Sequence, residues 1–181
     1  MKKLISALIT VIVVAGVPSG CATAPKTEGA KSSLHQDVVA AVARFKDEDP
    51  GLLEFFDNAH GYAVFPSVGK GGIGLGGAFG RGELFEGGEV VGFCALTQAT
   101  IGLQLGGQAY SELIFFEHQH SLEDFKSGTF EFAAQASAVA VTAGASADAD
   151  YEHGVAVFTM TKGGLMYEAS IGGQKFSFVP K

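Results

Sequence analysis

The chain has 181 residues, a formal net charge of −7 and a pI near 5.1, with 47% hydrophobic and 17% charged residues. This balance excludes an intrinsically disordered protein, and the negative charge argues against nucleic-acid binding through phosphate contacts. Glycine is frequent, with 26 residues, but no G-X-Y period runs through the chain, which excludes collagen. The length predicts one folded domain in which glycines serve turns and close backbone contacts.

The first residues resemble a secretion signal. Two lysines after Met1 precede the apolar run Leu4–Val17, which is shorter than a typical membrane span. The run ends in Val17-Pro18-Ser19-Gly20-Cys21, which resembles a bacterial lipobox, although Pro18 stands where an aliphatic residue is usual. We therefore expect a signal peptide over residues 1–20, lipidation of Cys21 and an outer-membrane anchor facing the periplasm. Cleavage after Ala22-Thr23-Ala24, which would give a soluble periplasmic or secreted protein, is the alternative.

The second cysteine, Cys94, lies in the apolar run Val90–Leu96. With Cys21 acylated, no intramolecular disulfide can form even in an oxidising compartment. A thiol in apolar surroundings has a raised pKa and little nucleophilicity. We expect Cys94 to be buried and inert.

After Cys21 the composition predicts a lipidated tether over residues 21–32, followed by the folded domain over 33–181. Ser33 fits a helix N-cap, and apolar residues at helical spacing predict an amphipathic helix from Leu34 to about Glu48. Pro50 suits the start of a second, short helix that ends near Asn58.

From Tyr62 onward, short runs rich in β-branched and aromatic residues alternate with glycines, which predicts successive antiparallel strands. The expected strands are Tyr62–Val68, Gly71–Gly80, Glu83–Glu86, Glu89–Gln98, Ile101–Gly107, Gln108–Glu117, Phe130–Thr142, Gly154–Met160, Gly164–Ile171 and Lys175–Val179. Turns are expected at Gly80-Arg81-Gly82 and Gly87-Gly88, and a loop at Ala143–Asp150. Ser121 is expected to cap a helical turn over Leu122–Ser127 that Gly128 closes.

These elements predict an α+β fold. N-terminal helices should pack on a curved, mostly antiparallel and glycine-rich β-sheet or partial barrel.

Three motifs occur in the order found in one known family. They are His60-Gly61-Tyr62-Ala63-Val64-Phe65-Pro66-Ser67-Val68-Gly69-Lys70-Gly71-Gly72, continuing through Gly80-Arg81-Gly82-Glu83, then Ile101-Gly102-Leu103-Gln104-Leu105-Gly106-Gly107 with a following strand that ends Leu113-Ile114-Phe115-Phe116, and Thr161-Lys162-Gly163-Gly164-Leu165. In these motifs the chain, from about Leu34 to its end, resembles the SYLF domain family.

The resemblance implies a lipid-binding domain with no enzymatic activity. Eukaryotic members bind phosphoinositide membranes and, in fungi, actin filaments, whereas bacterial members are commonly small secreted lipoproteins. We therefore expect binding to phospholipid or phosphoinositide-type headgroups and leave actin aside. The chain departs from the family pattern in having no tryptophan and in an alanine-rich segment over 130–150, so its lipid-contact surface is expected to differ.

Several motifs of other functions have simpler structural explanations. The sequence Gly72-Ile73-Gly74-Leu75-Gly76-Gly77 matches G-x-G-x-x-G, but no helix pattern follows it, and Gly69-Lys70-Gly71 lacks the Ser or Thr of a P-loop, so neither nucleotide nor another cofactor is expected. His118 and His120 are more simply solvated side chains than metal ligands. A metal site is therefore not expected. No nucleophile elbow occurs, so catalytic residues are not expected either.

Lys70, Arg81, Lys162 and Lys175 all lie near glycines and expected turns, where side chains and backbone N–H groups could contact a lipid phosphate. They are the candidate headgroup contacts, with a scatter of cations for solubility as the alternative. Two modes of lipid binding stay open: a cavity lined by residues such as Phe65, Phe79, Phe93 and Phe115, or an amphipathic helix, Leu34–Phe45, that lies on a bilayer. A structural protein of the cell envelope, whose partner is another protein and whose lipid is only an anchor, is the alternative function.

Overall fold

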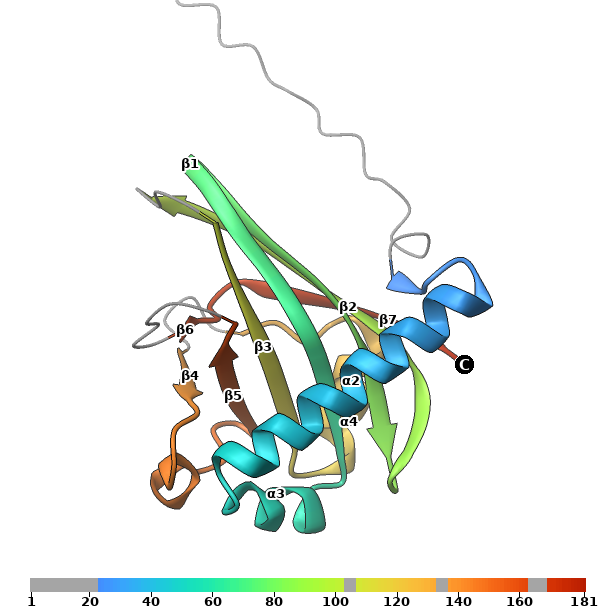
Figure 1. Cartoon of the computed structure of the whole chain (residues 1–181), viewed down its shortest axis with the longest axis vertical. Helices are drawn as coiled ribbons and strands as arrows, with labels where there is room; N and C mark the ends of the chain where they lie inside the picture. Colours follow the sequence, from blue (N-terminus) through green and yellow to red (C-terminus); the bar gives the residue numbers. More distant parts are fainter. Residues whose placement is uncertain (1–22, 103–106, 133–136, 163–168) are drawn as a thin grey trace, which may run out of the picture.

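The structure is a computed structural model, and it describes residues 23–102, 107–132, 137–162 and 169–181. Two helices precede the sheet (Figure 1): α2 (Glu28–Glu48) and α3 (Leu52–Asn58). The expected second helix and its end at Asn58 are confirmed. No helix within the described residues is long and apolar enough to cross a membrane.

Helix α2 begins six residues earlier than the sequence predicts. Its N-cap is Thr27, whose side-chain oxygen accepts a hydrogen bond from the backbone N–H of Ala30 at 3.2 Å, whereas Ser33 lies inside the helix. Both residues satisfy the pattern of a helix cap, and the apolar periodicity begins only at Leu34, which is why the sequence placed the start too late. The segment 28–32, expected as tether, is therefore helical.

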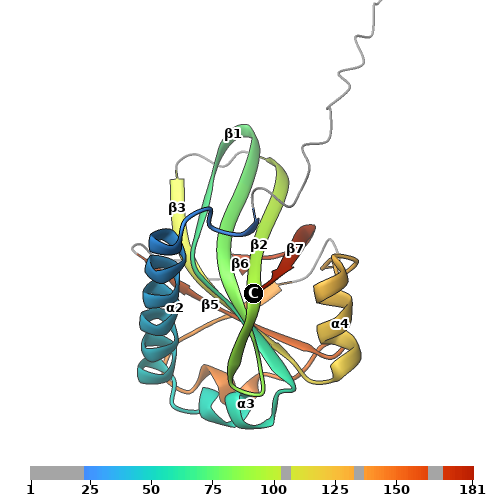
Figure 2. The same ribbon diagram turned by 90° about the vertical axis from the view of Figure 1, so that its right-hand side faces the viewer.

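Strand β1 (Gly61–Glu86) is the longest element and folds back on itself at its upper end (Figure 2). Its two halves lie against one another, because a Cβ atom on Gly80 would be 3.1 Å from the carbonyl oxygen of Ser67, and one on Gly82 would overlap that of Val64. The expected turn at Gly80-Arg81-Gly82 is therefore wrong: these residues are extended, and the two glycines permit close backbone approach.

The remaining strands are β2 (Glu89–Gly102), β3 (Gly107–Phe116), β4 (Ser137–Ala140), β5 (Val155–Thr161), β6 (Ala169–Ser170) and β7 (Gln174–Pro180). Within the described residues they form a sheet in the order β6-β4-β5-β3-β1-β2-β7, antiparallel except for the β4–β5 pair. The turn between β1 and β2 at Gly87-Gly88 is confirmed, with φ values of 59° and 84°. The α+β fold with a mostly antiparallel sheet is thus confirmed.

Three expectations need correction. Helix α4 (Gln119–Ser127) starts with His118 as its N-cap rather than Ser121, although Gly128 closes it in the left-handed region as predicted. In the segment Phe130–Thr142, expected as one strand, the only strand among the described residues is β4, with four residues. Residues 133–136 and 163–168 lie outside the described structure. The expected loop Ala143–Asp150 contains a short 3-10 helix, η1 (Ala145–Asp148).

The two faces of the sheet are covered by different helices, α2 on one side and α4 on the other (Figure 2). Val38, Ala41 and Phe45 of α2 are fully buried in an apolar cluster with Leu113 and Phe115 of β3. We call this side of the sheet the α2 face. The cluster on the opposite, α4 face contains Leu122 and Phe125 of α4, together with Phe65, Ile114 and Phe176. The upper end of the β1 hairpin extends beyond both helices (Figure 2).

The sheet is strongly curved. The side-chain amide of Gln174, on the edge strand β7, donates to the phenol oxygen of Tyr110 at 3.3 Å and to a carboxylate oxygen of Glu112 at 3.0 Å. Tyr110 and Glu112 lie on β3, with β1 and β2 between them and β7 in the sheet order. A flat sheet would hold these strands too far apart for direct contact, so the expectation of a curved sheet is confirmed.

Candidate functional site

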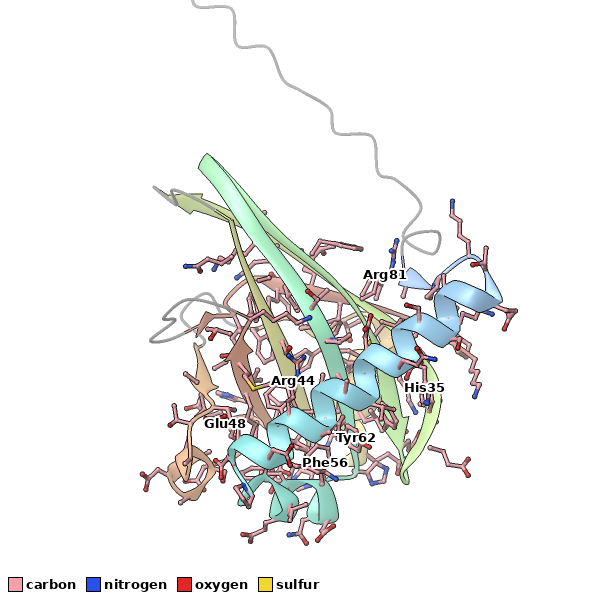
Figure 3. All side chains as sticks on the ribbon, viewed as in Figure 1. His35, Arg44, Glu48, Phe56, Tyr62 and Arg81 are labelled. Atoms are coloured by element: carbon pink, nitrogen blue, oxygen red, sulfur yellow. The ribbon has the colours of Figure 1, made fainter. Side chains whose placement is uncertain are left out.

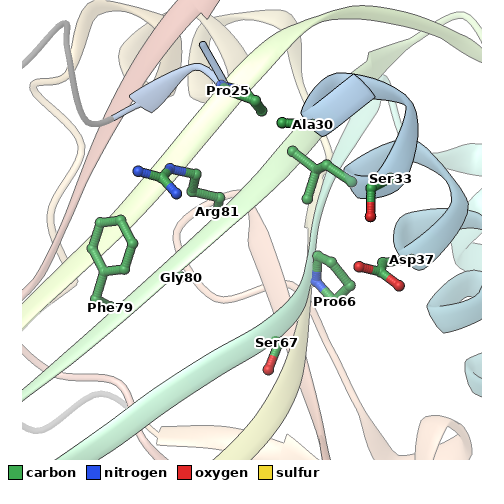
Figure 4. Close-up of a pocket in the computed structure, with 10 residues that line it drawn as sticks. Pro25, Ala30, Ser33, Asp37, Pro66, Ser67, Phe79, Gly80 and Arg81 are labelled. Atoms are coloured by element: carbon green, nitrogen blue, oxygen red, sulfur yellow. The ribbon is translucent and has the colours of Figure 1, made fainter. Parts of the chain in front are cut away.

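A groove of about 370 Å³ lies between the N-terminal part of α2 and the β1 hairpin (Figure 4). We call it the Arg81 groove. Its walls combine apolar, hydroxyl and charged side chains from the N-terminal segment, α2 and both halves of β1. The residues that line it are Pro25, Ala30, Ser33, Leu34, Asp37, Pro66, Ser67, Phe79, Gly80 and Arg81.

Strand geometry explains why an aromatic ring and a cation face this groove together. Phe79 and Arg81 are two positions apart on β1, so both side chains point to the α2 face while Gly80 faces the other way. The Arg81 guanidinium carbon is 5.3 Å from the centre of the Phe79 ring, within the range of a cation–π contact. Phe79 keeps 41% of its surface exposed, which is unusual for phenylalanine.

A hydrogen bond to a buried carboxylate joins α2 to this part of β1. Glu83 is only 3% exposed, and its carboxylate lies 2.8 Å from Nδ1 of His35, on the first half of α2. Figure 3 shows Arg81 near the N-terminal end of the same helix. Asp37, on α2, adds one negative charge to the wall of the groove and lies apart from Arg81 (Figure 4). The groove therefore lies between α2 and β1, which this contact joins, and its walls carry both signs of charge.

The structure places Lys175 on the same face as Arg81. In the sheet register, Phe79 of β1 pairs with Thr97 of β2, and Thr97 pairs with Lys175 of β7. Residues paired directly across strands point to the same face. The Lys175 side chain is 69% exposed, and its ammonium group lies 3.5 Å from the carboxylate of Glu131. Arg81 and Lys175 thus flank one strip of the sheet.

The other two candidate lysines lie apart from this strip. The backbone N–H of Lys162 donates to the carbonyl oxygen of Ala109 at 3.0 Å, so Lys162 continues the pairing of β3 with β5. Its exposed side chain lies on the α2 face, but farther across the sheet than Arg81 and Lys175. Lys70 pairs with Gln108 and alternation places it on the α4 face. Burial lowers the pKa of Lys70, and the charge of Glu112 opposes this effect. Cys21 lies outside the described residues.

Comparison with known proteins finds a family that part of the chain resembles. Residues 97–179, which are 83 of the 181, match the model of the Ysc84 (SYLF) family, described as "Las17-binding protein actin regulator". Over this segment the chain is similar to the SYLF family. A protein named beta cell expansion factor A, from Aeromonas veronii, is 28% identical over 156 residues, which are 84% of this chain and 59% of that protein. The chain thus spans less than two thirds of the length of this relative.

The family match confirms the resemblance inferred from the motifs, and its printed description is that of a binding protein. The matched segment contains Lys162 and Lys175 but neither Lys70 nor Arg81. The Arg81 groove is therefore formed by the part of the chain that precedes the matched segment.

Sequence reasoning missed a buried polar cluster on the α4 face of the sheet. Glu112 is fully buried, and burial raises its pKa to about 7, although hydrogen bonds from Gln174 and Tyr110 and the charge of Lys70 act in the opposite direction. Burial and the nearby Glu112 also raise the pKa of Tyr110. One carboxylate oxygen of Glu112 has no hydrogen-bond partner among the described residues. The available signal was a single carboxylate within the apolar run of β3.

The two modes of lipid binding left open by the sequence do not agree with the structure. Phe65 and Phe115 are buried on opposite faces of the sheet and Phe79 is exposed, so the expected set of four phenylalanines lines no common cavity. The apolar face of α2 is buried against the sheet and is not available for a bilayer.

The remaining side-chain expectations can be compared directly. Cys94 is fully buried, and burial raises its pKa well above the ordinary value, as predicted for an inert thiol. His118 and His120 are exposed with their rings stacked, in agreement with solvated side chains. Within the described ranges, no group of three or more His, Cys, Asp or Glu side chains is placed to hold a metal ion.

Proposed function

We propose that the protein is a non-catalytic, lipid-anchored protein of the bacterial outer membrane, facing the periplasm, whose folded domain binds phospholipid headgroups at the Arg81 groove. The observation that carries this proposal is the half-exposed Phe79 beside the Arg81 guanidinium. An aromatic ring with an adjacent cation suits the boundary between acyl chains and phosphates, because the ring enters the apolar layer while the cation contacts the phosphate.

Charge supports the same surface. Although the chain is acidic overall, Arg81, Lys175 and Lys162 all project from the α2 face of the sheet beyond the buried part of α2. Each basic residue close to an anionic membrane surface contributes about 1 kcal/mol of binding free energy. Arg81 and Lys175 are the principal headgroup contacts in this proposal and Lys162 is an outlying one, whereas Lys70 serves the buried polar cluster instead.

The position of the N-terminal segment also supports it. The hydroxyl of Thr23 lies 2.6 Å from that of Ser177 on β7, and Ser177 is in register with Arg81 through Ala95 of β2. Cys21 precedes Thr23 by only two residues. A lipid attached to Cys21 would therefore hold this end of the sheet, and with it the Arg81 groove, close to the membrane surface.

The test is cosedimentation of the purified chain with vesicles of phosphatidylethanolamine and phosphatidylglycerol, at low and high salt. Replacing Arg81 or Lys175 with glutamine should weaken binding about fivefold each, in line with about 1 kcal/mol per cation, and this loss should shrink as salt screens the charges. Phe79→Ser should weaken binding several-fold at both salt concentrations, since the contribution of the ring is apolar.

Two matched controls separate this surface from general effects. Arg44 is exposed on α2 away from the groove, and Leu53 of α3 is 47% exposed, close to the value of Phe79. Arg44→Gln and Leu53→Ser should leave vesicle binding unchanged. Equal losses in the control and groove variants, or binding that none of them alters, would contradict the proposed site.

A protein partner in the cell envelope is the second candidate function. The family description names a binding partner that is a protein, and that is the observation in its favour. In this case the purified chain would bind no vesicles, and Phe79→Ser would instead abolish crosslinking to a specific envelope protein in cells.

A further inference from the structure

A second and larger pocket, of about 580 Å³, shares none of its described lining residues with the Arg81 groove. We call it the acidic-rimmed pocket. It lies among β4, β5, η1 and the segment after α4, near the left-hand edge of the sheet in Figure 1. Its volume falls within the range of small-molecule binding pockets, about 300–1,000 Å³.

The interior of this pocket is apolar and belongs to the protein core. Phe132, Val155, Val157 and Ile171 line it, and each is at most 8% exposed within the cluster on the α4 face. Phe130, which packs against that cluster, forms a further part of the wall. A ligand that enters this pocket therefore contacts the hydrophobic core directly.

The rim has the opposite character. Glu131, Asp148, Asp150 and Glu152 line the pocket and are all exposed, and the other titratable lining residue is His153. No lysine or arginine is among the described lining residues. The ammonium group of Lys175 lies 3.5 Å from the carboxylate of Glu131. Four carboxylates around an apolar pocket repel anionic headgroups and attract cations.

We propose that the acidic-rimmed pocket binds a cationic amphiphile, an organic ammonium group carrying an apolar chain. The chain occupies the space lined by Phe132, Val157 and Ile171, and the ammonium group stays at the rim between Asp148, Asp150 and Glu152. Charge complementarity selects this occupant over an anionic phospholipid or a fatty acid, whose negative head would meet the same carboxylates. This site is separate from the Arg81 groove, so it does not depend on the proposed membrane contact.

The experiment is isothermal titration calorimetry of the purified chain with decylammonium chloride below its micelle concentration, with decyl sulfate as the matched anionic probe. Decylammonium should bind with a stoichiometry of one, at least tenfold more tightly than decyl sulfate. Shortening the chain should weaken binding about fourfold for each methylene removed, as expected for apolar burial. Binding should also weaken at high salt.

Variants at the exposed rim test the role of charge without changing the core. Asp150→Asn and Glu152→Gln should each weaken decylammonium binding about two- to fivefold, the range of exposed ion pairs. The matched control is Asp47→Asn, an exposed carboxylate in the last turn of α2, which should have no effect. Ala149→Trp should block the pocket, because Ala149 lines it and is only partly buried.

Equal affinity for the two probes, binding that the rim variants and Ala149→Trp leave unaltered, or the absence of saturable decylammonium binding would each overturn the proposal. These outcomes are distinct from a failure of the proposed membrane contact, because vesicle binding depends on Arg81, Lys175 and Phe79 and none of these residues lines the acidic-rimmed pocket.

Discussion

Replacing Glu112 with glutamine should remove a pH dependence of folding stability that the wild-type chain shows between about pH 4.5 and about 7. In the folded protein, burial raises the pKa of Glu112 from the ordinary 4.5 to about 7, so the folded state holds a proton that the unfolded state has released in this range. When the folded state binds more protons, stability falls as pH rises. The loss of stability is complete above about pH 7 and absent below about pH 4.5.

The difference between the two pKa values corresponds to about 3 kcal/mol, at about 1.4 kcal/mol for each pKa unit. Glutamine keeps an oxygen that can accept the hydrogen bond from Gln174, but it carries no charge that must be desolvated. Glu112→Gln should therefore match the wild type in free energy of unfolding near pH 4.5 and exceed it by up to about 3 kcal/mol at pH 8.

The assay is urea denaturation at a series of pH values, with the wild type, Glu112→Gln and Glu89→Gln compared. Glu89 is exposed at the start of β2, so Glu89→Gln should follow the wild-type curve between pH 5 and pH 8. The difference between wild type and Glu112→Gln cancels the titration of histidines common to both. Parallel curves for these two proteins, or a difference that grows as pH falls, would refute the account of Glu112 as a buried carboxylate that is desolvated on folding.

Three further predictions concern the fold. Gly82→Ala should lower the free energy of unfolding by about 3 kcal/mol, because its Cβ would overlap the facing half of β1. Gly69→Ala should have little effect, since nothing lies within 4 Å of the added carbon, and thermal unfolding of both variants tests this difference. Burial alone would raise the pKa of Asp49, but hydrogen bonds from Ser146 and other groups outweigh this effect, so the pKa is lowered. Asp49→Asn should therefore lower the free energy of unfolding by about 2 kcal/mol at pH 7, measured by urea denaturation. This difference should shrink as pH falls below about 3.8. Cys94 should not react with an aromatic disulfide reagent until denaturant unfolds the chain, and rapid reaction in native buffer would contradict its burial.

Part of the fold and of the site could be read directly from local patterns. The second helix, the turn at Gly87-Gly88 and the left-handed closure at Gly128 depend on backbone preferences that act within a few residues. The charge of Arg81 and its flanking glycines identify it as a candidate contact. The same glycines, however, predict a turn, and only the packing of the two halves of β1 shows that they permit close approach within the sheet.

The sequence by itself determined the α+β class, the alternation of apolar and polar positions along the strands and the resemblance to the SYLF family, since each of these follows from composition, period or motif. The tertiary structure decided which side chains meet. Register across three strands places Lys175 beside the strip of Phe79 and Arg81, and curvature of the sheet brings Gln174 to Glu112. These contacts join residues far apart in the chain, and the pairing of strands that creates them depends on packing of the whole sheet against α2 and α4 rather than on any local preference.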